Sequence, residues 1–164
     1  MDNTNDAQPS QLVFVMQIIS VSLILGVLVF LGVAFVMTQG QQPKPPMLTY
    51  VALGFTGLTI IGHWLFRMPV RPSQAAVENF DLHSEQLFRD LAPYYQTEHI
   101  IKMALLEGAA FFNGVVYMQE ANWWNLAAMG LLVFLMLIRF PTQSRVIAWI
   151  ERRTVAWQFG DTHN

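Results

Sequence analysis

The chain carries four apolar segments, each long enough to cross the hydrocarbon core of a bilayer as a helix. They cover residues 12–37, 47–66, 99–118 and 123–140, and the only charged residues in them are Lys102, Glu107 and Arg139. A helix spans the core with about 20 apolar residues. Lipid offers the backbone no hydrogen-bond partner, so each spanning segment must be helical. The sequence therefore predicts an all-α integral membrane protein with four transmembrane helices.

The composition agrees with this class and excludes several others. Charged residues make up 12% of the chain, about half the share usual in soluble domains. There is no cysteine, so disulfides, thiolate nucleophiles and cysteine metal sites are excluded. No phosphate-binding loop, zinc-protease motif or nucleophile elbow occurs. We therefore expect a single, non-enzymatic membrane domain over residues 1–164, without a cofactor, a metal or a nucleic-acid partner.

The loops arrange these helices as two hairpins. Residues 38–46 and 119–122 form short connections, whereas the loop 67–98 and the tail 141–164 are long. Apolar residues recur at helical spacing in both long stretches, which predicts an amphipathic helix lying on the bilayer surface in the loop and a second one in the tail. The apolar positions are Leu87, Phe88, Leu91, Tyr94 and Tyr95 in the loop, and Val146, Ile147, Ile150 and Trp157 in the tail.

Basic residues lie almost entirely on one side of the predicted membrane. Lys44 alone falls on the side of the short loops. Because cytoplasmic loops carry the excess of Lys and Arg, both termini and the loop 67–98 are expected in the cytoplasm, with the helices in the inner membrane. Three arginines of the tail are candidates for binding anionic lipid headgroups, or form an ordinary basic flank: Arg145, Arg152 and Arg153.

Glu107 is the one acidic residue within an apolar segment. A carboxyl group at that depth is costly, so it is the first candidate functional residue. We expect it to be uncharged and to hydrogen-bond a neighbouring helix, with Thr56 and Asn113 completing a candidate ion or proton site. Small residues at helical spacing beside it predict a face for close helix packing. They are Ala104, Gly108, Ala110 and Gly114.

Residues 104–117 carry a resemblance to known families. The run Ala-Leu-Leu-Glu-Gly-Ala-Ala-Phe-Phe-Asn-Gly-Val-Val-Tyr resembles the Ala-Leu-x-Glu helix of small uncharacterised bacterial four-helix membrane proteins, which implies no particular activity. Locally it also resembles the carboxylate helix of rotary ATPase proteolipid subunits, in which the glutamate carries H⁺ or Na⁺. The glycine ladder of the companion helix in that family is missing from this chain.

Three functions follow from these patterns. The first is a structural or accessory subunit that acts through helix contacts with itself or with other membrane proteins. The second is translocation of H⁺ or Na⁺ by Glu107. The third is haem or quinone binding near His63 and His99, two histidines expected at similar depth.

Overall fold

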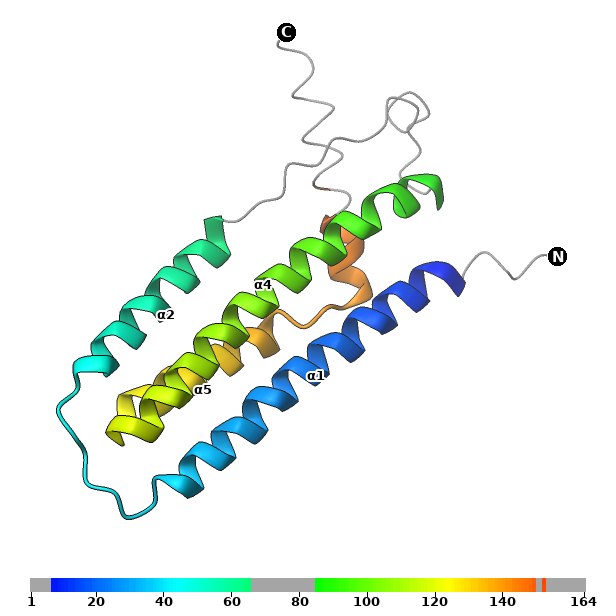
Figure 1. Ribbon diagram of the computed structural model, residues 1–164. Coiled ribbons are helices and arrows are strands. Elements are labelled where there is room, and N and C mark those ends of the chain that lie inside the picture. Colours follow the sequence, from blue (N-terminus) through cyan, green and yellow to red (C-terminus); the bar gives the residue numbers. More distant parts are fainter. Residues whose placement is uncertain (1–6, 66–84, 150–151, 153–164) are drawn as a thin grey trace, which may run out of the picture. The chain divides into compact units, whose positions relative to one another are not determined.

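The computed structural model describes residues 7–65, 85–149 and 152, and this part of the chain is helical, without a strand. Its main helices are α1 (Ala7–Met37), α2 (Met47–Leu65), α4 (Glu85–Glu120) and α5 (Trp123–Ile138), shown in Figure 1. A short helix, Gln143–Trp149, follows α5. The prediction of an all-α chain is confirmed for the described residues.

The chain divides into two compact units. The bundle unit consists of Ile19–Phe66 and Ile100–Phe140, and the terminal unit consists of Met1–Ile18, Arg67–His99 and Pro141–Asn164. The bundle unit holds α2, α5 and the larger parts of α1 and α4.

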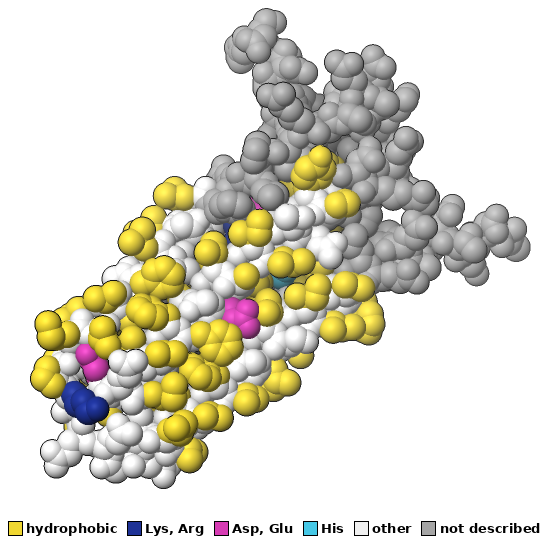
Figure 2. All heavy atoms as spheres, viewed as in Figure 1, with side chains coloured by type: hydrophobic (Ala, Val, Ile, Leu, Met, Phe, Trp, Pro, Cys, Tyr) yellow, Lys and Arg dark blue, Asp and Glu magenta, His cyan; other side chains and the backbone are white. Residues whose placement is uncertain are grey.

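Within the described residues, three helices are long and apolar enough to cross a membrane. The spans are Val13–Met37, Met47–Leu65 and Pro93–Glu120. The helix α5 has 16 residues, about 24 Å at 1.5 Å per residue. It counts as a fourth span when it is taken together with Gln143–Trp149. Hydrophobic side chains are spread along the helical surface seen in Figure 2 with few charged ones among them, as expected for helices that face lipid.

The apolar core of the bundle unit is built by α1, α4 and α5. The ring of Phe30 on α1 meets Phe111 on α4 edge to face, with centroids 5.0 Å apart. Gly114 lets these helices approach, because a Cβ atom there would lie 2.4 Å from Cε1 of Phe30. The core residues are Ile24, Val27, Met103, Leu106, Ala109, Ala110, Met129, Leu132, Val133 and Met136.

The helix α2 joins the bundle unit through a mainly polar face. Its buried residues are Thr49, Ala52, Thr56, Thr59 and His63, here called the α2 seam. They repeat at steps of three and four residues, so they lie on one side of the helix. The opposite side exposes large apolar residues. The seam therefore attaches α2 largely through polar side chains, and apolar contacts flank it: the Phe55 ring meets Phe112 of α4 edge to face at 5.7 Å, and Ile60 packs against the core.

The third predicted span begins earlier than the sequence analysis placed it. One helix, α4, runs from Glu85 to Glu120, so the prediction of a separate surface helix in the loop 67–98 is wrong for residues 85–98. Pro93 lies inside α4 and removes one backbone donor. No glycine follows it before Gly108, and the Thr97 hydroxyl donates to the Pro93 carbonyl at 2.8 Å. The polar residues after Pro93 therefore continue the helix.

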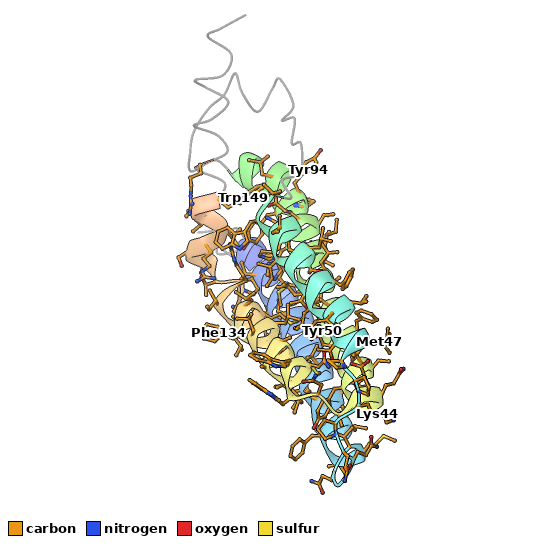
Figure 3. All side chains as sticks on the ribbon, turned by 90° about the vertical axis from the view of Figure 1, so that its left-hand side faces the viewer. Lys44, Met47, Tyr50, Tyr94, Phe134 and Trp149 are labelled. Carbon is orange, nitrogen blue, oxygen red and sulfur yellow. The ribbon has the colours of Figure 1, made fainter. Side chains whose placement is uncertain are left out.

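The predicted tail helix is described over its first part. The Thr142 carbonyl accepts hydrogen bonds from the backbone N–H groups of Arg145 and Val146, at 3.0 and 3.2 Å, which starts the helix Gln143–Trp149. In the terminal unit the Trp149 ring meets Tyr95 edge to face at 5.4 Å; Figure 3 labels Trp149. The predicted tail residues Ile150, Arg153 and Trp157 lie outside the described residues.

Candidate functional site

The N-terminus of α2 is capped by a carboxylate from another helix. The two residues before α2 are prolines, which carry no side-chain acceptor for its unpaired N–H groups. Glu120, the last residue of α4, fills this role. Its Oε1 atom accepts from the Leu48 N–H at 2.7 Å, and Oε2 accepts from the Thr49 N–H at 2.9 Å. Figure 3 labels Lys44 and Met47 at this end of the bundle unit.

The same carboxylate begins a chain of side-chain hydrogen bonds. The Thr49 hydroxyl donates to Glu120 Oε2 at 2.7 Å. It accepts from Nδ2 of Asn125, on α5, at 2.7 Å. Asn125 is fully buried, and its Oδ1 atom has no hydrogen-bond partner among the described residues. Three helices thus meet at Thr49 through polar contacts.

Asn113 and Thr56 form a second polar contact nearer the middle of the bundle unit. Nδ2 of Asn113 donates to the Thr56 hydroxyl at 2.7 Å and to the Ala109 carbonyl at 2.8 Å. The Thr56 hydroxyl donates in turn to the Ala52 carbonyl at 2.9 Å. The structure therefore brings together two of the three residues of the candidate ion or proton site.

Glu107 lies apart from these two residues. It is the central residue of the span Pro93–Glu120 and is partly exposed. Its Oε1 atom is 3.8 Å from the position that a Cβ atom would take at Gly26, so the carboxyl group faces α1 and not α2. Within the described part of the chain no hydrogen bond joins it to another residue.

The predicted small-residue face is divided between the inside and the outside of the bundle unit. Ala110 and Gly114 are buried, and Gly114 packs against Phe30. Ala104 and Gly108 are exposed, and a Cβ atom at Gly108 would meet nothing within 4 Å. Half of this face therefore builds the bundle, and the half next to Glu107 remains open.

The two histidines belong to different units. His63 is buried at the end of the α2 seam and hydrogen-bonds the backbone of Lys102, with Arg139 nearby. In the terminal unit the His99 ring stacks on Tyr95, with centroids 6.0 Å apart. Among the described residues no group of three His, Cys, Asp or Glu side chains could hold a metal ion.

Basic side chains have varied surroundings. The Arg139 guanidinium lies over the Trp64 ring, 4.7 Å from its centroid. Of the arginines predicted to bind lipid headgroups, Arg145 and Arg152 are exposed, and Arg153 lies outside the described residues. These positions suit contact with water or headgroups.

Glu120 and Asn125 were missed by sequence reasoning. Each lies close to the end of an apolar segment, where a polar residue is ordinarily read as part of a loop. The signal was the pair Pro45-Pro46, which starts a helix without a capping side chain and so requires an acceptor from elsewhere.

Comparison of the chain with protein-family models, curated proteins and solved structures finds no match.

Proposed function

We propose that this chain is a non-enzymatic subunit of the cytoplasmic membrane that binds a transmembrane helix of another subunit. The observation that carries the proposal is the setting of Glu107. Its carboxyl group lies at the centre of a span and has no hydrogen-bond partner among the described residues. The exposed Ala104 and Gly108 lie beside it on the same helix.

A carboxyl group in hydrocarbon is costly unless another polar group meets it. Small residues on either side let a second helix come close enough for such a bond. The occupant of this face is therefore a transmembrane helix that presents a hydrogen-bonding side chain, such as Ser, Thr, Asn or Gln, at the depth of Glu107. This face of α4, defined by Ala104, Glu107 and Gly108, is called the α4 open face.

Photocrosslinking in native membranes tests the proposal. A photoreactive residue at Ala104 is expected to give one discrete adduct, and the adduct is expected to disappear when Gly108→Ile fills the open face or Glu107→Leu removes the carboxyl group. Leu58, 71% exposed on α2, is the matched control position and is expected to give no such adduct. An adduct that survives both substitutions, or equal labelling from Leu58, would contradict the proposal.

Ion translocation by Glu107 is the second candidate. It is favoured by the same partly exposed carboxyl group, which has no hydrogen-bond partner among the described residues and could exchange H⁺ or Na⁺. Glu107→Gln keeps the size of the side chain and a hydrogen-bond donor. In the subunit role, this variant still forms the adduct. In the carrier role, it abolishes H⁺ or Na⁺ flux in reconstituted vesicles while the protein still inserts.

The orientation belongs to the same proposal. The four segments cross the membrane as two hairpins, with both termini in the cytoplasm and Lys44 on the outer side. Trp123 and Trp124 stack at 4.0 Å and are both exposed. Their position at the start of α5 suits an aromatic anchor at the outer interface.

A further inference from the structure

Three buried acceptor atoms without a hydrogen-bond donor lie along the α2 seam. They are Oδ1 of Asn125, Oδ1 of Asn113 and Nδ1 of His63, and in the described part of the chain no other buried side-chain nitrogen or oxygen lacks a partner. Asn125 pairs with Thr49 and Asn113 pairs with Thr56. The three atoms therefore lie at the levels of residues 49, 56 and 63 of α2. Successive levels are seven residues, or about 10 Å, apart along the helix.

The hydrogen bonds around the two amides fix which atom is unpaired. The hydroxyls of Thr49 and Thr56 already donate, to Glu120 and to the Ala52 carbonyl. They can therefore only accept from the neighbouring asparagine, so each Nδ2 must point toward its threonine. Reversing either amide would place two acceptors against each other. Each asparagine consequently leaves an oxygen that needs a donor.

His63 supplies the third acceptor. Its ring hydrogen-bonds the backbone of Lys102, inside α4. The N–H of a residue within a helix is already used in the helix, so the Lys102 carbonyl accepts and the ring nitrogen Nε2 donates. The charged groups that face His63 are Arg139, which follows the last residue of α5, and Lys102 on α4. Nδ1 of the neutral ring is then an acceptor, like the two amide oxygens.

We propose that the α2 seam is hydrated, with buried water molecules donating to these acceptors at its three levels. Water is the ligand class that the chemistry selects, because it is a small donor and interior polar groups without protein partners are commonly satisfied by internal water. The seam is lined on α2 by the short side chains of Ala52, Thr56 and Thr59. This inference does not rest on the proposed partner helix, which concerns the α4 open face.

Hydration gives the two sides of α2 different surroundings at the same depth. Thr59 is on the buried seam, whereas its neighbour Leu58 is 71% exposed on the opposite, lipid-facing side. A polar ion should therefore reach position 59 and not position 58. A seam filled only by protein would exclude the ion from both positions.

Silver-ion labelling in lipid vesicles tests this difference, because the chain has no cysteine of its own. Ag⁺ is small and reacts with thiolate, which forms where water reaches the sulfur. Thr59→Cys is expected to react at least about tenfold faster than Leu58→Cys. After each time of exposure to Ag⁺, the protein would be unfolded and the thiols that have not reacted would be counted. Equal rates at the two positions would overturn the proposal.

A second set of variants separates hydration from simple looseness of the bundle. Adding Thr56→Val and Asn113→Leu to Thr59→Cys removes the polar atoms that bind water, and silver labelling is expected to slow by about tenfold. Ala52→Cys repeats the measurement at another seam position if Thr59→Cys does not insert. An unchanged rate in the apolar background would also overturn the proposal.

Discussion

The Glu120 carboxylate holds Thr49 through both its backbone N–H and its hydroxyl, at 2.9 and 2.7 Å. These bonds join the last residue of α4 to the first turn of α2. The two residues are 71 positions apart in the sequence. A cap of this kind fixes where α2 starts, and it adds a polar contact between α2 and α4 to the edge-to-face contact of Phe55 with Phe112.

Removing this cap is expected to destabilise the protein. Glu120→Ala leaves the N–H groups of Leu48 and Thr49 and the Thr49 hydroxyl without their acceptor, so the unfolding midpoint in an SDS titration should fall. Glu120→Gln keeps one acceptor oxygen, and its midpoint should lie between those of Glu120→Ala and the natural protein. Gln119→Ala, at the exposed neighbouring position, is the control and should have no effect. If the unfolding midpoint of Glu120→Ala equals that of the natural protein, the capping role is refuted.

A methyl group at Gly114 is expected to force α1 and α4 apart. The added Cβ would lie 2.4 Å from Phe30 Cε1 and 2.9 Å from Cδ1, in a core where the Phe30 ring also meets Phe111. Overpacking of this kind costs about 1–3 kcal/mol, so Gly114→Ala should lower the free energy of unfolding by that amount. Gly130→Ala on α5 is the matched control, because a Cβ there meets nothing within 4 Å. Equal stability of the two variants would show that the ring moves aside.

Sequence patterns predicted the helices well because length and apolarity decide them. The segments 47–66 and 123–140 differ from α2 (Met47–Leu65) and α5 (Trp123–Ile138) by one or two residues at their C-terminal ends. The start of α4 was wrong because hydropathy reports where the chain becomes apolar, at residue 99, whereas helix formation continues through polar residues. Only the absence of a glycine after Pro93 hinted at the longer helix.

The site was harder to predict because it depends on which residues of different helices meet. Thr56 and Asn113 were named as site residues, and the structure pairs them. Glu107 was placed with them by depth alone, yet depth does not determine the direction around a helix, and its carboxyl group faces Gly26 of α1. Glu120 acts on Thr49 and Leu48, 71 and 72 positions away, a relationship that one sequence without a fold does not reveal.

The Asn113–Thr56 bond is expected to contribute a modest, measurable coupling. Hydrogen bonds between transmembrane helices average about 0.6 kcal/mol, with values up to about 1.7 kcal/mol. A double-mutant cycle with Asn113→Leu and Thr56→Val, measured by SDS unfolding, should give a coupling energy within that range. The two single variants should destabilise less than additively when combined, because each removes the same bond. Strict additivity would mean that the 2.7 Å contact contributes nothing to stability.

Cysteine labelling tests the orientation of the chain. Gln41 is exposed in the connection between α1 and α2, and Gln143 is exposed at the start of the helix Gln143–Trp149. A membrane-impermeant maleimide should label Gln41→Cys in intact cells, since Lys44 alone places that loop outside. It should label Gln143→Cys only after the inner membrane is opened, because that region carries Arg139, Arg145 and Arg152. The chain has no natural cysteine, so each signal reports one position. The reverse pattern would mean that the acidic N-terminal tail, with Asp2 and Asp6, and not the later arginines, sets the topology.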